Sequence, residues 1–258
     1  MIFYLQIQKL LNNQTSNPGI KNTAMMKLKP KYILFCFLPF SLLSCKKDNY
    51  DAPSSTLKGR ILYNNEEIGL EYDRVPLEIY QPGFGKKGAI AASFAQDGSY
   101  STLLFDGNYK LIIPNGQGPF KWHQNTAGVN DTLSVAVNGN QTLDLQAIPY
   151  YLIRNTVYKV AGKELTATFR VDQIITGNEA KNIERINLYV NKTQFVSGAD
   201  NIISAVLPGG SMADPASLSL KVNVPAIVPA QNYVFARIGV KIEGVEDMVF
   251  SPLQKIQL

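Results

Sequence analysis

An apolar residue at every second position is the feature that most constrains the fold of this chain. The pattern recurs in short separate runs: Leu57-Gly59-Ile61-Tyr63, Val75-Leu77-Ile79, Tyr109-Leu111-Ile113, Leu133-Val135-Val137, Leu143-Leu145, Leu165-Ala167-Phe169-Val171, Leu218-Leu220-Val222-Val224 and, with one step of three, Phe235-Ile238-Val240. Side chains alternate between the two faces of a strand, so each run predicts a strand with one buried face. No long segment has a helical period. We therefore predict an all-β protein.

Turn signals separate these runs. They are Asp97-Gly98, Asp106-Gly107-Asn108, Asn138-Gly139-Asn140 and Gly209-Gly210. Glycine and asparagine tolerate the positive φ that tight hairpin turns require. Short strands with a turn about every ten residues are typical of β-sandwiches. We place a boundary near Ala147 to Tyr150 and predict two tandem sandwiches, over residues 57–147 and 148–258.

The net charge of +5 suggests nucleic-acid binding until the charges are located along the chain. Five of the 25 basic residues and none of the 20 acidic residues lie in residues 1–44, so the rest of the chain carries 20 of each sign. Phosphate binding depends on a basic surface. We therefore expect no nucleic-acid partner.

The N-terminal segment has the pattern of an export signal. Lys27, Lys29 and Lys31 precede the apolar run 32–43, which is shorter than the roughly 20 residues of a spanning helix. The run ends at Leu42-Leu43-Ser44-Cys45, which resembles a bacterial lipobox. We predict that residues 1–44 are a signal peptide whose assigned start is too early, and that Cys45 carries lipid. An ordinary signal peptide with a chance cysteine is the alternative.

Residues 45–56 are predicted to form a tether behind that lipid. Lys46, Lys47, Asp48 and Asp51 resemble the charged tag that Bacteroidetes lipoproteins carry for export to the outer face of the outer membrane. A solvated tether is the alternative. More than one acyl chain gives stable anchoring. Because Cys36 lies in the signal, the mature chain has no disulfide, cysteine nucleophile or cysteine metal site.

Two stretches suggest the type of each sandwich. Residues 96–100 (QDGSY) and 105–111 (FDGNYKL) resemble the carboxypeptidase-regulatory or Cna-B type of transthyretin-like sandwich. In this pattern we expect Tyr100 and Tyr109 to face the core edge with their hydroxyls toward solvent. Residues 148–258 resemble an immunoglobulin- or fibronectin-like sandwich, with 233–240 as a late central strand.

A wider set of motifs occurs in a fixed order. It comprises residues 104–110, 118–120, 131–132, 148–151, 165–169 and 233–240, with a Ser-Pro near the end. With the lipobox, the set resembles a two-domain family of Bacteroidetes outer-membrane lipoproteins encoded beside SusC/SusD-like pairs. The resemblance implies polysaccharide or SusC/SusD-like proteins as partners. It carries over no catalytic residue.

The segment 114–131 is the most informative about a binding site. It is long for a loop in a sandwich, and long loops are often functional. It holds the only tryptophan, Trp122, together with Phe120, His123, Gln124 and Asn125. Aromatic rings stack on sugars and amides bind their hydroxyls, so we predict a glycan-binding platform. Packing of Phe120 and Trp122 at the sandwich end or on the second domain is the alternative.

Other candidate sites are weaker. Thr132, in Asp131-Thr132-Leu133, resembles the O-glycosylation site of Bacteroidetes proteins. Tyr150 and Tyr151 would line an interdomain groove or pack at the linker. Residues 83–88 match G-x-G-x-x-G, but the helix needed to bind a dinucleotide does not follow. His123 is the only histidine and no G-x-S-x-G occurs, so no zinc site, cofactor or nucleophilic device is expected.

The sequence therefore predicts a non-catalytic, lipid-anchored protein on the cell surface that assists polysaccharide capture. A structural or protein-interaction lipoprotein without a small ligand is the second hypothesis. A glycoside hydrolase is the third, because carboxylates are plentiful, although they fall mostly in turns and tails.

Overall fold

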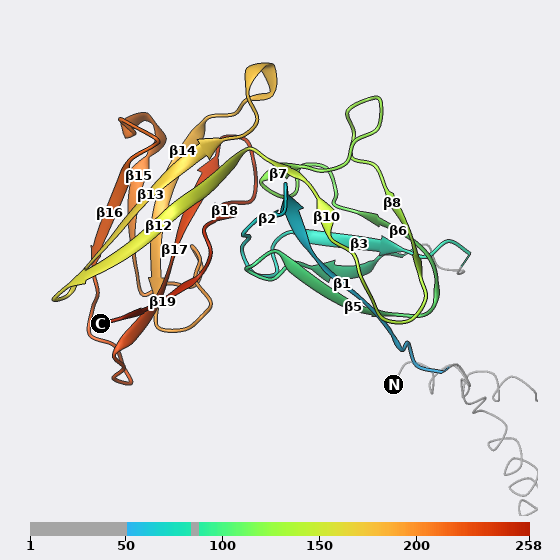
Figure 1. Cartoon of the computed structure of the whole chain (residues 1–258), viewed down its shortest axis with the longest axis horizontal. Coiled ribbons are helices and arrows are strands. Elements are labelled where there is room, and N and C mark those ends of the chain that lie inside the picture. The colour runs from blue at the N-terminus through green and yellow to red at the C-terminus, as the bar shows by residue number, and fades with distance from the viewer. Residues whose placement is uncertain (1–50, 84–87) are drawn as a thin grey trace, which may run out of the picture. The chain divides into compact units, whose positions relative to one another are not determined.

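The computed structural model describes residues 51–83 and 88–258. Residues 52–258 form one compact unit. Its regular structure consists of strands and two single-turn 3-10 helices, η2 (Gly177–Glu179) and η3 (Gly209–Ser211), which confirms the all-β prediction (Figure 1). No helix among the described residues is long and apolar enough to cross a membrane. The predicted signal peptide and Cys45 lie outside this part of the chain.

Two sheets form the N-terminal sandwich. In the first, β1 (Ser55–Tyr63) pairs with four shorter strands: β2 (Glu66–Glu67), β5 (Ser99–Leu104), β9 (Gln141–Thr142) and β10 (Leu145–Gln146). The second has the order β4 (Ile90–Ser93), β3 (Pro76–Tyr80), β6 (Gly107–Ile112), β8 (Leu133–Val137). A separate pair joins β7 (Phe120–Lys121) to β11 (Ile148–Pro149). The alternating residues Leu57, Ile61, Leu77 and Ile79 are fully buried in the core, as their period predicts.

The tyrosines that follow the Asp-Gly turns correct one expectation. Tyr100 and Tyr109 are 4% and 1% exposed. Their hydroxyls donate hydrogen bonds to the backbone oxygens of Leu143 (2.7 Å) and Phe105 (2.8 Å) instead of pointing to solvent. Buried hydroxyls need such partners because an unpaired one costs free energy. Gly98 has a φ of +74°, and a Cβ there would lie 2.5 Å from the Ile68 oxygen, so this turn does require glycine.

The C-terminal sandwich also has two sheets (Figure 1). One has the order β12 (Tyr151–Ala161), β13 (Glu164–Gln173), β16 (Leu218–Asn223). The other has the order β15 (Ile203–Pro208), β14 (Ile183–Asn191), β17 (Tyr233–Ile242), β18 (Val249–Phe250), with β19 (Gln254–Gln257) also paired to β17. Strands β13 and β16 alternate between buried and less buried residues, as predicted from Leu165–Val171 and Leu218–Val224.

Strand β14 departs from that alternation. Its residues from Ile186 to Asn191 are all buried. One face joins the main core, while Tyr189 on the other face packs with Val196, Met248 and Phe250 in a second, smaller cluster. A strand covered on both faces has no period-two signature. That is why the alternating pattern did not reveal β14.

The two sandwiches meet around Arg237, whose side chain is fully buried. From β17 its guanidinium donates to the backbone oxygens of Leu70, Gln96 and Ser251, and to Gln96 Oε1, at 2.9–3.1 Å. The guanidinium carbon lies 4.4 Å from the ring centroid of Phe250. Burial lowers the pKa of Arg237 to about 9, so it stays charged at neutral pH. We call these contacts the Arg237 junction.

Gly69 allows the backbones to approach at this junction. It forms an isolated antiparallel bridge with Phe250, whose N–H donates to the Gly69 oxygen at 2.9 Å. A Cβ on Gly69 would lie 2.3 Å from the Phe250 oxygen. Only glycine therefore fits here.

Candidate functional site

The predicted glycan loop is folded back onto the N-terminal sandwich. Strand β7 pairs with β11, and Trp122 directly after it is 4% exposed. The Trp122 indole N–H donates to the backbone oxygen of Asp131 at 2.9 Å. Asn130 Nδ2 donates to the Ile113 oxygen at 2.8 Å. These bonds join the two ends of the loop, so it has a defined shape.

These positions correct the aromatic-platform interpretation. Phe120 is 5% exposed, and its ring covers Gly118. Neither Phe120 nor Trp122 is exposed enough to form the open stacking platform. Both belong to the hydrophobic core, which matches the packing alternative. The physical reason is that the β7–β11 pair brings the loop's aromatic side chains inward.

A pocket of about 500 Å³ nevertheless opens beside this loop. Its lining residues are Tyr63, Asn64, Lys121, Trp122, His123, Gln124, Gln146, Ala147 and Ile148. We call it the Tyr63 pocket. Ligand pockets are commonly about 300–1,000 Å³. The fold thus brings Trp122, His123 and Gln124 to one pocket, with Trp122 as a buried part of its wall.

The polar side chains of the Tyr63 pocket have unused hydrogen-bonding capacity. Within the described residues, the side chains of Tyr63, Asn64, His123, Gln124 and Gln146 make no hydrogen bond. None of the nine lining residues is acidic. Lys121 is paired, because its Nζ lies 2.5 Å from Glu179 Oε1. Donors and acceptors without partners are available to a ligand, and amides and hydroxyls match the hydroxyl groups of a neutral polar molecule.

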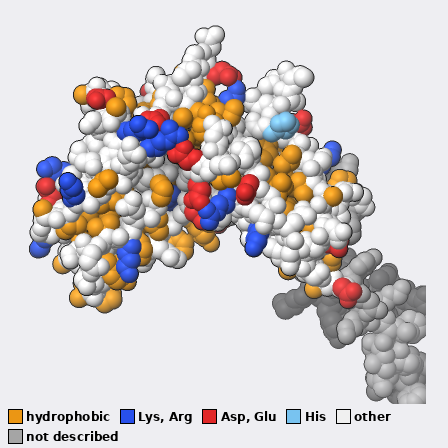
Figure 2. Space-filling view, viewed as in Figure 1, with side chains coloured by type: hydrophobic (Ala, Val, Ile, Leu, Met, Phe, Trp, Pro, Cys, Tyr) orange, Lys and Arg blue, Asp and Glu red, His pale blue; other side chains and the backbone are white. Residues whose placement is uncertain are grey.

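Three chain segments position these groups. Tyr63 ends β1, and Asn64 and Asn65 form the following turn with φ of 50° and 66°. Gln146 belongs to β10, which pairs with β1 opposite Leu62. His123 and Gln124 follow β7, and His123 is exposed; the histidine is visible at the surface in Figure 2. The same view shows acidic and basic side chains intermingled instead of a patch of one sign.

Tyr63, Asn64 and Gln146 were not predicted as site residues from the sequence. Tyr63 was assigned only to the alternating face of a strand. The Asn64-Asn65 pair is a hairpin-turn signal that would have placed Tyr63 at a strand end. No local signal links Gln146 to the loop at 123–124, because they are joined only by sheet pairing.

The remaining predicted residues have other positions. Asn125 does not line the Tyr63 pocket, since its Oδ1 accepts the N–H groups of Ala127 (2.9 Å) and Val129 (3.2 Å). Thr132 is partly exposed, and its N–H donates to Asp131 Oδ1 at 2.7 Å. O-glycosylation of Thr132 stays a prediction. The described residues contain no group of three or more His, Cys, Asp or Glu that could hold a metal ion.

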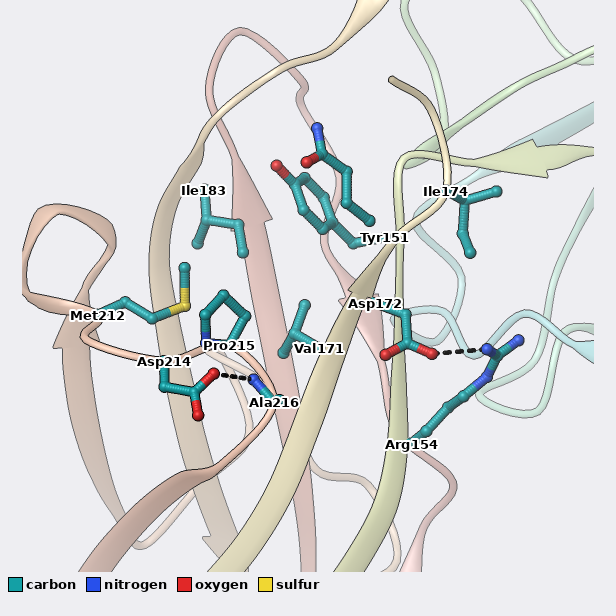
Figure 3. A pocket seen from close by; sticks show the side chains of 11 residues that line it. Tyr151, Arg154, Val171, Asp172, Ile174, Ile183, Met212, Asp214, Pro215 and Ala216 are labelled. Carbon is teal, nitrogen blue, oxygen red and sulfur yellow. Dashed lines mark hydrogen bonds and ion pairs between the residues drawn. The ribbon is translucent and has the colours of Figure 1, made fainter. Parts of the chain in front are cut away.

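A second pocket, of about 680 Å³, lies in the C-terminal sandwich (Figure 3). Its apolar lining includes Val171, Ile183 and Met212, and we call it the Tyr151 pocket. The Tyr151 hydroxyl donates to the Lys181 oxygen at 2.6 Å.

The charged groups around the Tyr151 pocket are already paired. Arg154 Nη1 lies 2.6 Å from Asp172 Oδ2, and Arg154 also pairs with Glu66. Asp214 accepts the Ala216 N–H at 2.9 Å. The hydrogen bonds from Arg154 to Glu66 and Asp172 raise the pKa of Arg154. The Tyr151 pocket therefore holds structural ion pairs, whereas the Tyr63 pocket holds unpaired polar groups.

Comparison with known proteins identifies the family. Residues 55–148 match the model of the DUF3823 N-terminal domain, a protein of unknown function, and residues 151–255 match the DUF3823_C domain of unknown function. A solved DUF3823 protein from Parabacteroides merdae is 31% identical, with a TM-score of 0.69, over 80% of this chain and 100% of that one. The chain belongs to the DUF3823 family. The predicted two-domain organisation is thereby confirmed.

Other solved structures share the fold. A DUF3823 protein from Bacteroides ovatus is 26% identical, with a TM-score of 0.67 over 80% of this chain and 100% of that one. A structure from Bacteroides uniformis, described as a candidate carbohydrate binding protein, is 18% identical with a TM-score of 0.63 and the same coverage. No curated protein matches the sequence. The transthyretin-like and immunoglobulin-like subtypes stay predictions.

Proposed function

We propose that this DUF3823 protein is a non-catalytic glycan-binding protein and that the Tyr63 pocket is its binding site. The observation that carries the proposal is the set of five polar side chains in this pocket without a partner in the described structure. Sugars are recognised by amide and hydroxyl groups arranged around an apolar wall. Here Trp122, Ala147 and Ile148 supply that wall.

The lining of the pocket favours binding over hydrolysis. Glycoside hydrolases generally use a pair of carboxylates at the scissile bond. None of the nine residues of the Tyr63 pocket is an Asp or Glu. The Bacteroides uniformis relative described as a candidate carbohydrate binding protein is similar in fold, and the proposal for this chain therefore depends on the pocket.

The proposed place of action comes from the N-terminal sequence. Lipid on Cys45 would anchor the chain to the outer membrane, and the charged residues after it favour the extracellular side. There the protein would deliver polysaccharide to a SusC/SusD-like complex. A lipoprotein that only spaces or binds other proteins is the competing hypothesis.

The test uses affinity gels that contain amylopectin, xylan, galactomannan, pectic galactan or laminarin. We expect one polysaccharide to retard the protein and to shift the emission of Trp122, because the chain has one Trp and it lines the pocket. Gln124→Ala and Gln146→Ala should each weaken binding about fivefold, since a net hydrogen bond is worth about 1 kcal/mol.

The matched control is Gln257→Ala, an exposed glutamine on β19. It should bind like the wild type. Retardation with no effect of Gln124→Ala or Gln146→Ala would move the site away from the Tyr63 pocket. No retardation by any of the five polysaccharides would favour the protein-interaction hypothesis.

A further inference from the structure

The Tyr63 pocket shares Lys121 and Gln124 with a smaller cavity. This second cavity, of about 250 Å³, is lined by both of these residues. Its other lining residues include Asn115, Tyr150, Glu179 and Lys181. We call it the Tyr150 pocket. Because both cavities have Lys121 and Gln124 in their walls, they adjoin each other.

The Tyr150 pocket draws on both sandwiches. Asn115 and Gln124 come from the N-terminal sandwich, whereas Glu179 and Lys181 lie beyond β13 in the C-terminal one. The Lys121–Glu179 ion pair connects the two sides at 2.5 Å. Lys121 is 23% exposed at its side chain and Glu179 is 65% exposed. The pair therefore borders a surface that runs from one sandwich to the other.

The second cavity has a tyrosine and the Gln124 amide in its lining, as the first does with Tyr63 and Gln124, but it also contains the charged Glu179 and Lys181. Tyr150 has a partly exposed ring, and its hydroxyl makes no hydrogen bond to the described residues. Lys181 Nζ lies 5.6 Å from the Tyr150 ring centroid. Burial raises the pKa of Tyr150, so the hydroxyl stays protonated and can donate. An aromatic ring with a hydroxyl donor beside the Gln124 amide suits a sugar.

The volume suggests what the second cavity adds. At about 250 Å³ it is below the roughly 300–1,000 Å³ of independent ligand pockets. It is better suited to continue a neighbouring site than to act alone. Gln124 lies in the shared wall and has an amide without a partner in the described structure, so it can contact a ligand that crosses from one cavity to the other.

We propose that the Tyr63 and Tyr150 pockets are successive subsites of one groove, which binds a glycan chain of several sugars instead of a single sugar. This proposal rests on the proposed glycan-binding function. It assigns the first subsite to the N-terminal sandwich and the second to its border with the C-terminal one. The buried Arg237 junction is consistent with this arrangement, because a groove across both sandwiches requires that they be held together.

The experiment measures dissociation constants by isothermal titration calorimetry for oligosaccharides of two, four and six sugars. The probes are malto-, xylo- and manno-oligosaccharides. We expect the hexasaccharide of one series to bind about tenfold tighter than its disaccharide. Tyr150→Phe removes only a hydroxyl, and Glu179→Gln keeps the size of an exposed side chain. Each should weaken hexasaccharide binding several-fold more than disaccharide binding.

Tyr233→Phe on β17 is the matched control, because Tyr233 lines neither of the two cavities. It should behave as wild type. Equal affinity for two, four and six sugars would overturn the two-subsite proposal while leaving the proposed function intact. An equal loss for all lengths in Tyr150→Phe would also overturn it. Absence of binding at every length in all three series would instead count against the proposed function itself.

Discussion

The Tyr63 pocket and the Arg237 junction are both rich in polar side chains, yet they differ in how those groups are used. At the junction, Arg237 has acceptors on Leu70, Gln96 and Ser251 and no exposure to solvent. In the pocket, the amides of Gln124 and Gln146 have no partner in the described structure. A buried polar group must be paired for the fold to be stable, whereas an accessible unpaired group can bind a ligand.

This difference distinguishes structural residues from functional ones better than residue type does. Arginine and tryptophan are often found at binding sites. Here Arg237 and Trp122 are both in the interior, and the groups proposed to bind a glycan are amides, a tyrosine and a histidine. Four substitutions test this division, beginning with the one that should have the largest effect.

Trp122→Ala should reduce the free energy of unfolding by about 3–5 kcal/mol, because a buried aromatic side chain leaves a cavity when it is removed. It also removes the hydrogen bond to Asp131. Urea unfolding monitored by circular dichroism would measure the loss. Trp122→Phe keeps a ring and should lose less. An unchanged midpoint for Trp122→Ala would place Trp122 with the ligand-binding groups.

Arg237→Met should cost about 3 kcal/mol, because it leaves several buried carbonyl oxygens without donors. The same denaturation experiment measures it. Lys221→Met on β16 removes a charge whose side chain is 64% exposed, and it should change stability little. If both variants had the same effect, the Arg237 junction would not stabilise the fold.

The effect of Asp247 on the free energy of unfolding depends on pH and should be smaller than the effects of Trp122→Ala and Arg237→Met. Its carboxylate accepts the Gly118 N–H at 2.8 Å, and burial raises its pKa above the ordinary value. The folded state therefore holds its proton to a higher pH than the unfolded state. The unfavourable contribution of Asp247 appears as the pH rises from the usual Asp range through the raised pKa.

The measurement is the unfolding free energy of wild type and Asp247→Asn between pH 4 and 7, a range of about three units above the usual carboxyl pKa. Relative to the variant, the wild type should lose stability as the pH rises. A difference that stays constant with pH, or that changes in the wild type's favour, would contradict the raised pKa.

Gln146→Ala should have the smallest effect on stability, within about 0.5 kcal/mol, because its exposed amide has no partner in the described residues. Thermal unfolding would measure it beside the loss of glycan binding expected above. A destabilisation comparable to that of Arg237→Met would mean that Gln146 has a structural role, and the contrast between pocket and junction would fail.

Strands with one buried face were well predicted from the sequence. The alternation in Leu165–Val171 and Leu218–Val224 corresponds to β13 and β16. Strand β14 could not be found in this way, because both its faces are covered. The tyrosine hydroxyls after the Asp-Gly turns were placed wrongly, since their acceptors, the Leu143 and Phe105 oxygens, come from a distant strand end and from a turn.

The candidate site was predicted only in part. The loop at 114–131 was identified because of its length and composition, and His123 and Gln124 do line a pocket. For Phe120 and Trp122 the sequence left an exposed platform and packing in the core as alternatives, and their burial matches the packing. The sequence shows which residue types the loop contains. The direction in which each side chain points depends on the pairing of β7 with β11.

The sequence by itself determined the strands with one buried face, the turns and the division into two β-domains, because these depend on periodicity and on residues that tolerate positive φ. It also contained the lipobox-like signal before Cys45. Only the tertiary structure decided which polar groups are paired. Arg237 meets Leu70 across 167 positions of the chain, and Gln146 reaches the pocket through sheet pairing. Hydrogen bonds between residues so far apart depend on packing, which no local pattern of residues specifies.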